Sequence, residues 1–300
     1  MTANNNHGIN PSDIDASVKP GQDFYEYATG GWKKNNPRNP QYSRYGVFEV
    51  LGELNQKQIR SLFDEMLKHN PEFGTVEQKV KDIYSQGLDS ARLNEEGAKP
   101  IQPLLSRINN AKRSEVFDIA VEGTLRTGTT LFDCGVGGDM LDSNINTMYL
   151  AGASISLPDR DYYIKDDAES KAIQKDYVAY LEKIMTLAGY SKKDAKRAAK
   201  NAYDVEYQIA LAKKSRTEMR DVTKRYNVYS IAKLNEDFKG VDWSGYFAAI
   251  GVPQVTSVIV SDPGHVAKSV ELFNSLKDQQ IKDFFCVQYV NRSTSYLSDD

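Results

Sequence analysis

Apolar residues recur at steps of three and four along most of the chain, which is the spacing of one face of an α-helix. The longest such stripe runs from Val47 to Met66 and stops before Asn70 and Pro71. Further stripes predict helices over residues 23–31, 75–84, 101–108, 114–125, 168–188, 191–214, 243–251 and 266–273, and another from residue 281 onward. The pattern therefore predicts a mainly α-helical protein.

Capping residues set the expected helix ends. Three stripes begin with a polar residue that has a partner three residues later, namely Asp23 with Glu26, Thr75 with Gln78, and Ser191 with Asp194. Such pairs satisfy the free backbone N–H groups of a first turn. Glycines that commonly terminate helices follow other stripes at Gly30–Gly31, Gly189 and Gly251.

One region has the character of a sheet. Residues 131–138 and 147–156 are two β-branched, glycine-containing runs separated by a polar segment. This arrangement predicts a small antiparallel pair of strands. The run "SVIV" at residues 257–260 fits one more strand.

Composition excludes some classes of protein. The net charge of −3 argues against a general nucleic-acid binder. No run of eighteen uncharged apolar residues is present, so no membrane-spanning helix is expected in this chain. Cys134 and Cys286 stand far apart without a CxxC pair, which favours buried free thiols over a disulfide framework. The polar start lacks an apolar signal core, so any secretory signal was removed or never existed.

Motifs for the common hydrolases and nucleotide-binding proteins are missing. The HExxH pattern of zinc peptidases, the GxSxG elbow, the Walker loop and GxGxxG do not occur. Glu65 and His69 share a helix face at four-residue spacing, but a histidine in a last turn is more often placed there by the helix dipole. We therefore expect no metal site in this chain. The basic residues between Lys192 and Lys200 are interpreted as a solvated helix face rather than a phosphate site.

The stretch "LPDRDYY" at residues 157–163 predicts a rigid corner. Pro158 sets a turn, and Asp159 and Asp161 can cap local backbone. Arg160 is expected to pair with one of these carboxylates, while Tyr162 and Tyr163 supply anchoring aromatic surface.

Six segments, in a fixed order across nearly the whole chain, carry a family resemblance. They are "KPGQDFYEYATGGW", "SRYGVFEVL", "SLPDRDYY", "VEYQIALA", "TEMRDVTKRYN" and "FKGVDWSGYF". With them the chain resembles the N-terminal half of the neprilysin and endothelin-converting enzyme family of zinc metallopeptidases. Two isolated cysteines do not match the several disulfides of extracellular animal members, so the bacterial oligopeptidase type is the better match.

The resemblance implies an architecture. It implies a mainly α, multi-helix lid domain with a small antiparallel β element, which closes over a thermolysin-like catalytic domain around a cavity that admits peptides. Residues 1–49 would be an N-terminal segment that packs on the catalytic domain and its cleft. Residues 50–300 would be the helical lid, incomplete at its C-terminus. The "NAYD" run at residues 201–204 matches a family substrate motif in letters only and is interpreted as helix packing.

The resemblance also implies site residues. The arginine of the "SRYG" segment pairs with the C-terminal carboxylate of a peptide, and Arg44 holds that position. A guanidinium suits this task because its planar fork donates two charge-assisted bonds. Glu49 would orient Arg44, and Tyr45 and Phe48 complete the predicted substrate-binding set.

The functional hypothesis is the substrate-selecting part of a zinc metalloendopeptidase that hydrolyses oligopeptides. Its expected partners are peptide substrates and a C-terminal catalytic half carrying HExxH and zinc, and this chain alone is expected to be inactive. The resemblance favours a periplasmic or cell-surface location over a cytoplasmic one. The alternative is a catalytically silent helical scaffold that binds peptides or a partner protein. A second polypeptide that carries HExxH would discriminate between them.

Overall fold

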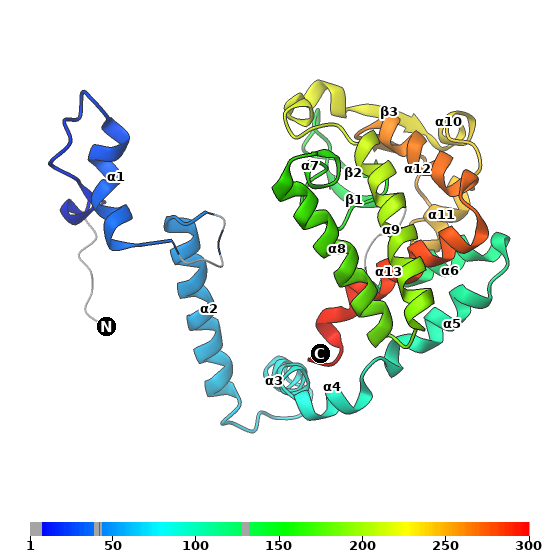
Figure 1. Cartoon of the computed structure of the whole chain (residues 1–300), viewed down its shortest axis with the longest axis horizontal. Helices are drawn as coiled ribbons and strands as arrows, with labels where there is room; N and C mark the ends of the chain where they lie inside the picture. Colours follow the sequence, from blue (N-terminus) through cyan, green and yellow to red (C-terminus); the bar gives the residue numbers. More distant parts are fainter. Residues whose placement is uncertain (1–7, 39–41, 43, 128–131, 300) are drawn as a thin grey trace. The chain divides into compact units, whose positions relative to one another are not determined.

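The computed structural model describes residues 8–38, 42, 44–127 and 132–299, and the chain forms two compact units (Figure 1). The first unit comprises Met1–Leu88 and the second Asp89–Asp300. The boundary predicted between residues 49 and 50 concerns contact with a catalytic domain and stays a prediction.

The described residues of the first unit form three α-helices. They are α1 (Phe24–Asn35), α2 (Val47–Met66) and α3 (Val76–Gly87), preceded by the short 3-10 helix η1 (Pro11–Asp13). The predicted caps are confirmed, since the Asp23 carboxylate accepts a hydrogen bond from Glu26 N and the Thr75 hydroxyl accepts one from Gln78 N. The long amphipathic helix from Val47 is confirmed as α2.

The expected end of the first helix at Gly30–Gly31 is wrong. Helix α1 continues through both glycines and is capped at Asn36. A Cβ atom on Gly31 would lie 2.3 Å from the carbonyl oxygen of Ser12, and one on Gly30 would lie 2.9 Å from the Cβ of Asp15. These glycines therefore allow residues 12–15 to pack closely against the helix, and they do not terminate it.

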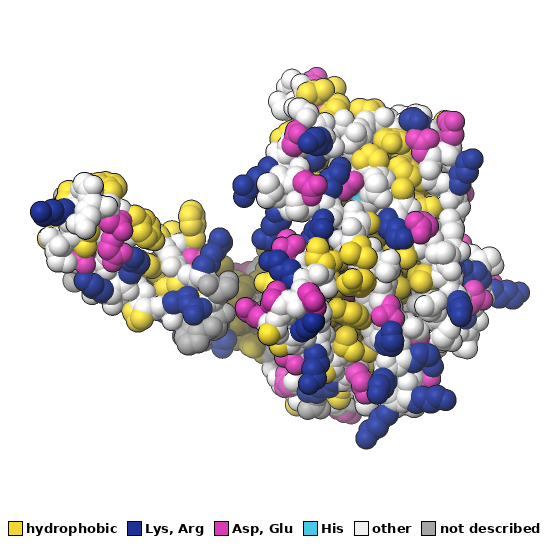
Figure 2. Space-filling view, turned by 45° about the horizontal axis from the view of Figure 1, so that its top comes forward, with side chains coloured by type: hydrophobic (Ala, Val, Ile, Leu, Met, Phe, Trp, Pro, Cys, Tyr) yellow, Lys and Arg dark blue, Asp and Glu magenta, His cyan; other side chains and the backbone are white. Residues whose placement is uncertain are grey.

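Helices α2 and α3 contact each other through stacked rings of Phe63 and Tyr84, whose centroids are 4.4 Å apart. Both helices are described in full, and neither has a fully buried residue. The apolar stripe that predicted α2 is instead largely exposed, as at Leu51 and Leu62. Hydrophobic side chains accordingly lie on the surface of the N-terminal unit, at the left of Figure 2.

The second unit contains the other elements, and most of the predicted helices are confirmed within it. Its helices are α4 (Ser90–Glu96), α5 (Gln102–Asn110), α6 (Arg113–Thr127), α7 (Asp161–Ile164), α8 (Ala168–Leu187), α9 (Lys192–Ala212), α10 (Ile231–Asp237), α11 (Trp243–Ala249), α12 (Pro263–Ser275) and α13 (Asp278–Ser293). Short 3-10 turns occur at Lys99–Ile101, Glu218–Arg220, Val222–Arg225 and Thr294–Tyr296.

Helix α9 is the centre of this unit, because it contacts α8, α12 and α13 (Figure 1). Its buried face is made of small residues, since Ala195, Ala198, Ala199 and Ala202 are all fully buried. Small side chains let neighbouring helices approach closely and pack ridge into groove. Helix α13 is buried on several sides, which explains why its apolar residues do not form a single stripe.

The sheet has four strands in the order β1-β2-β4-β3. Their bounds are β1 (Asp133–Gly138), β2 (Asn146–Ala151), β3 (Asn227–Ser230) and β4 (Ser257–Val260). The predicted antiparallel pair β1–β2 is confirmed, and so is the "SVIV" strand, which joins β2 in parallel. Residue 131, where the first strand was expected to begin, lies outside the described residues.

Two features of the sheet were not predicted. Strand β3 is only four residues long and alternates between half-buried and exposed positions, so its pattern is too short to detect. Strand β2 ends at Ala151 rather than at residue 156, because Gly152 packs against α12. A Cβ atom on Gly152 would lie 2.6 Å from the carbonyl oxygen of His265.

Both cysteines are free thiols, as predicted. Burial raises the pKa of Cys134 to about 11 and that of Cys286 to about 12, which keeps both protonated and unreactive. Among the residues that the structure describes, no helix is long and apolar enough to cross a membrane.

Candidate functional site

The predicted substrate arginine lies just before helix α2. Arg44 has 88% of its side chain exposed, and its Nε donates a hydrogen bond to Glu49 Oε1 at 3.1 Å. Within the described part of the chain, no other partner of the guanidinium is present. Glu49 therefore holds the guanidinium at Nε, and the Nη groups of this exposed side chain can donate hydrogen bonds to a ligand.

Glu49 is positioned to hold that arginine. It belongs to the first turn of α2, where a negative charge interacts favourably with the helix dipole. Helix α2 begins after Gly46, which supplies no side-chain cap, so Glu49 is the acidic group at this end. Its side chain is only 16% exposed. The predicted pairing of Glu49 with Arg44 is thus present in the geometry, whereas the role in substrate binding stays a prediction.

Aromatic contacts hold Tyr45, which lies just before α2. The Tyr45 ring lies 6.3 Å from the Trp32 ring and 5.6 Å from the Tyr42 ring. Its hydroxyl donates a hydrogen bond to Glu53 Oε2 at 3.3 Å. Contacts with Trp32, Tyr42 and Glu53 therefore anchor the Tyr45 side chain within the first unit.

Phe48, the fourth predicted residue, is 86% exposed. A phenyl ring on the surface next to Arg44 can contact an apolar side chain of a ligand. Five cavities of about 310 to 550 Å³ lie among the described residues of the second unit, and none of these five is lined by any of the four predicted residues.

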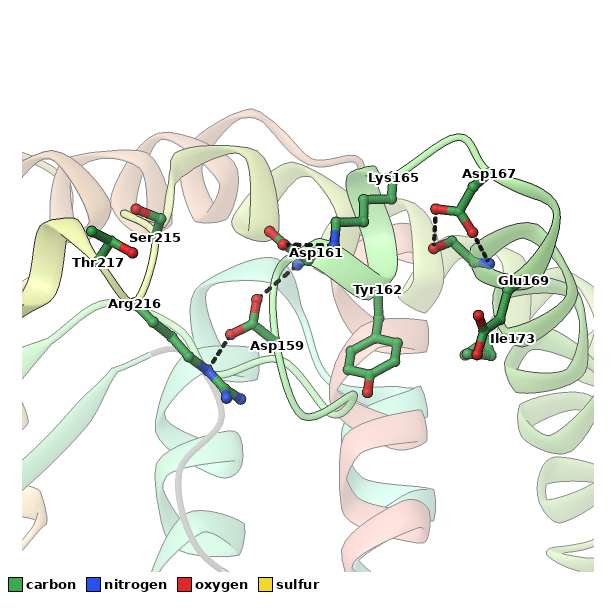
Figure 3. A pocket seen from close by; sticks show the side chains of 11 residues that line it. Asp159, Asp161, Tyr162, Lys165, Asp167, Glu169, Ile173, Ser215, Arg216 and Thr217 are labelled. Carbon is green, nitrogen blue, oxygen red and sulfur yellow. Dashed lines mark hydrogen bonds and ion pairs between the residues drawn. The ribbon is translucent and has the colours of Figure 1, made fainter. Parts of the chain in front are cut away.

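The most specific sequence motif, residues 157–163, lies beside a pocket of about 550 Å³ (Figure 3). Asp159 accepts a hydrogen bond from the backbone of Asp161, as expected for a capped corner. Lys165 pairs with Asp161 at 3.2 Å, and Arg216 pairs with Asp159 at 2.5 Å. The pocket edge is therefore lined by neutralised ion pairs.

The expected pairing of Arg160 with Asp159 or Asp161 is wrong. Arg160 Nη1 donates instead to the backbone carbonyl of Lys213, just after α9. The two aspartates are occupied by Arg216 and Lys165, which the sequence did not place nearby. Arg160 thus links the corner to the end of α9.

A buried glutamate on α9 holds the corner formed by residues 157–163 through hydrogen bonds. Glu206 is fully buried, and its Oε2 accepts hydrogen bonds of 2.8 Å from both Tyr163 and Tyr177. Its Oε1 accepts from the Ser156 hydroxyl and from Gln288 Nε2, each at 2.5 Å. Burial, and then the negative charge of Glu206, raises the pKa of both tyrosine hydroxyls well above their usual value. Two matching sequence segments, "SLPDRDYY" and "VEYQIALA", are thereby joined.

A second buried carboxylate joins α9 to α13. Asp283 is 1% exposed and accepts from Arg197 Nε at 3.0 Å and from Asn201 Nδ2 at 2.7 Å. The interpretation of "NAYD" as helix packing agrees with this contact. Within the basic stripe on α9, Arg197 reaches the buried Asp283, while Lys200 pairs with Asp204 on the surface.

The described residues do not fit a zinc site. No group of three or more histidine, cysteine or acidic side chains able to hold a metal ion occurs among them. Glu65 and His69 do come within 3.3 Å of each other, but both are exposed and no third ligand joins them. Two ligands on a solvated helix end do not make a protein zinc centre.

Sequence reasoning missed Glu206, Asp283 and the groups around Lys213. A glutamate within an otherwise apolar and alanine-rich helical face, as at Glu206, was the available signal. Its meaning depends on partners from residues 156, 163, 177 and 288, which no local pattern brings together.

The sequence of this chain matches the sequence model of a known protein family. The model described as Peptidase family M13, for the N-terminal part of these enzymes, matches residues 20–300. The chain belongs to peptidase family M13. The resemblance to the neprilysin and endothelin-converting enzyme family is thereby confirmed, and so is the mainly helical fold class.

Curated members of family M13 show the same relation at moderate identity. Bovine endothelin-converting enzyme 1 is 26% identical over 298 residues, covering 95% of this chain and 39% of the relative. The endothelin-converting enzyme homolog of Locusta migratoria is 26% identical over 307 residues, covering 95% of this chain and 42% of the relative. The chain thus spans about two fifths of the length of these relatives.

Solved M13 structures share the fold. The crystal structure of Mycobacterium tuberculosis zinc metalloprotease ZMP1 in complex with an inhibitor matches with a TM-score of 0.85 and 24% identity, over 97% of this chain and 45% of that one. The PepO structure from Lactobacillus rhamnosis matches with a TM-score of 0.71 and 18% identity, over 94% and 45%.

Proposed function

We propose that this chain is the substrate-selecting N-terminal part of a zinc-dependent metalloendopeptidase that hydrolyses oligopeptides. Membership in family M13 supports the reaction class, and the lack of HExxH in the sequence together with the lack of a fitting zinc site in the described residues supports a division of labour. Zinc would activate water for attack on the peptide carbonyl when bound by a catalytic half. This chain would bind and orient the peptide.

The observation that carries the substrate role is the geometry of Arg44. A guanidinium that is 88% exposed, yet held at Nε by a mostly buried carboxylate, is pre-oriented with its remaining donors free toward solvent. A peptide carboxylate can accept from those donors in a charge-assisted pair. Phe48 would contact the adjacent side chain of the peptide, Tyr45 would anchor the segment, and Glu49 would fix the fork.

The clamp is tested by the variant Arg44→Ala in a complete peptidase reconstituted by supplying the catalytic half. Because hydrogen bonds to charged groups contribute about 1.5–3 kcal/mol, kcat/KM for a peptide with a free C-terminus should fall by about tenfold or more. The same peptide with an amidated C-terminus should change little. Kinetics on both peptides make the measurement.

The matched control is Arg60→Ala, which removes an exposed arginine from α2 that pairs with Asp64. It should leave both peptides unaffected. An equal loss on the free and the amidated peptide would reject the clamp. Hydrolysis that never appears on adding a catalytic half, with peptide binding retained, would favour the silent scaffold.

The chain by itself is proposed to be inactive. Incubation of the purified 300 residues with a fluorogenic peptide and zinc should give no hydrolysis above a buffer control. Cleavage that is abolished by a chelator and tracks with the pure protein would contradict this. A bacterial source and a periplasmic or cell-surface location belong to the same proposal, supported by the two unpaired cysteines and the family resemblance.

A further inference from the structure

A second cavity, of about 420 Å³, adjoins the corner pocket and shares Asp159 and Arg216 with it. Its walls come from the loop after β2, from the residues that follow α9, and from the first turn of α12. The proposed peptidase role makes no use of this cavity. All of its lining residues belong to the second unit.

The charges on its walls do not balance. Four cationic side chains line the cavity against two carboxylates, namely Arg160, Lys213, Lys214 and Arg216 against Asp159 and Asp262. Lys214 pairs with Asp262 at 3.3 Å and Arg216 pairs with Asp159 at 2.5 Å. Both carboxylates are therefore already occupied.

Lys213 and Arg160 are the two cations left over. Neither has an ion pair within the described parts of the chain. Arg160 is held by its bond to the carbonyl of Lys213, and its Nε is buried without a hydrogen-bond partner in the same described set. Burial lowers the pKa of Lys213, while the negative charges of Asp133, Asp262 and Asp159 act in the opposite direction without cancelling this shift.

His265 closes the inner wall of the cavity. It is only 4% exposed, and its Nε2 is buried with no partner among the residues that the structure describes. A backbone hydrogen bond to Ala153 holds the ring. Burial lowers the pKa of His265 to about 4, and the nearby Lys213 cation acts in the same direction, so the ring is neutral at pH 7. Asp262 opposes this shift but does not cancel it.

We propose that this cavity binds a small oxyanion, a phosphate ion or the carboxylate of an acidic side chain, between Lys213, Arg160 and His265. Arg160 Nε is a buried donor without a partner among the described residues, and Lys213 forms no ion pair there, so an oxyanion can accept from both side chains. Its negative charge offsets part of the positive charge of Lys213 and Arg160. His265 then takes a proton from solvent and donates from Nε2 to the bound group.

The geometry favours an anion over a metal cation for a simple electrostatic reason. Lys213 and Arg160, which form no ion pair among the described residues, repel a metal ion, and the two carboxylates that line the cavity already have cationic partners. The inference does not rest on the proposed peptidase function, because Arg44 lies in the other unit and no residue is shared.

The test titrates the 300-residue chain with inorganic phosphate, with sodium chloride added to keep ionic strength constant. Binding is followed by calorimetry and by the ring nitrogen shifts of His265. We expect saturable binding, a rise in the pKa of His265, and a rise in melting temperature with phosphate because the ligand binds the folded state.

Lys213→Met is the informative variant, since it removes the charge but keeps a long apolar stem. Phosphate affinity should fall by tenfold or more, and the phosphate-dependent rise in melting temperature should disappear. Lys200→Met, on the exposed face of α9, is the matched control and should bind like the unmodified chain. His265→Asn is a second variant that tests the inner wall.

Circular dichroism establishes that each variant is folded. The absence of saturable binding by the folded unmodified chain, or an equal loss in Lys213→Met and Lys200→Met, would overturn the proposal. The source of the oxyanion is separated with two C-terminally amidated peptides that differ only by Asp or Asn. Competition by the Asp peptide alone assigns the site to acidic peptides, whereas competition by neither assigns it to free phosphate.

Discussion

The two units of this chain use similar amphipathic helices in different ways. Leu181 and Met185 of α8, in the second unit, are fully buried, whereas Leu51 and Leu62 of α2 in the first unit are 53% and 66% exposed. The second unit has a continuous core with buried carboxylates at its centre. A hydrophobic stripe thus predicts a helix in both units, but it predicts burial in only one.

The comparison shows where packing stabilises the chain. Side chains around Glu206 and Asp283 in the second unit are fixed by packing and by hydrogen bonds, so substitutions of these buried residues should act mainly on folding. In the first unit, the exposed Arg44 and Phe48 carry little of the packing and are available to a ligand.

Among the substitutions considered, Glu206→Ala should lower the free energy of unfolding the most. Removing the carboxylate leaves the hydroxyls of Tyr163 and Tyr177 and the amide of Gln288 buried without their partner. We expect the free energy of unfolding to fall by about 3–5 kcal/mol, measured by urea denaturation.

The counterpart in the first unit is Glu53→Ala, which removes one hydrogen bond from Tyr45. Its cost should be about 1 kcal/mol or less. Similar losses for Glu206→Ala and Glu53→Ala would break the distinction between the units.

A smaller contrast is expected between two leucines. Leu181→Ala creates a cavity in a packed core and should lower the free energy of unfolding by about 2–5 kcal/mol. Leu51→Ala truncates a half-exposed side chain and should cost about 1 kcal/mol or less. The two variants are compared in the same urea series. A large loss for Leu51→Ala would show that α2 is packed in solution.

The smallest effect concerns pH. His265 has a folded pKa of about 4 against 6.5 for the free group, so the unfolded chain binds more protons between these values. The stability that the neutral His265 contributes is therefore fully present above pH 6.5, and it is lost as the pH falls toward 4. The histidine should make the free energy of unfolding about 2 kcal/mol lower at pH 5 than at pH 7.

The contribution of His265 is isolated with His265→Asn, which should remove about that much of the pH dependence. His69→Gln, which changes an exposed histidine of the first unit, is the matched control. Equal pH profiles for His265→Asn and the unmodified chain would contradict the neutral buried state.

Much of the fold was predictable because it follows from the spacing of apolar and capping residues along the chain. The stripes of α2, α8 and α9, the caps at Asp23 and Thr75, and the pair β1–β2 all follow from spacing of a few residues. The role of Gly30 and Gly31 in α1 was predicted wrongly because it depends on a backbone segment fifteen or more residues away, which a local pattern does not include. Strand β3 was missed because four half-exposed residues carry too little pattern.

In the candidate site, too, one contact was predictable from the sequence and another was not. The pairing of Arg44 with Glu49 was accessible from sequence because both residues lie within one turn of a predicted helix start. The partner of Arg160 was not, because the competing groups Lys213 and Arg216 come from a segment more than fifty residues later.

The sequence by itself determined the helical period, most helix ends and the family, because these depend on neighbours along the chain and on the order of short motifs. The spatial arrangement sets which polar groups are buried together, such as Glu206 with two tyrosines, and which cations line one cavity, such as Lys213 and Arg160. The physical reason is that burial and charge compensation depend on distances in space, and the chain brings together residues for which no local pattern encodes that distance.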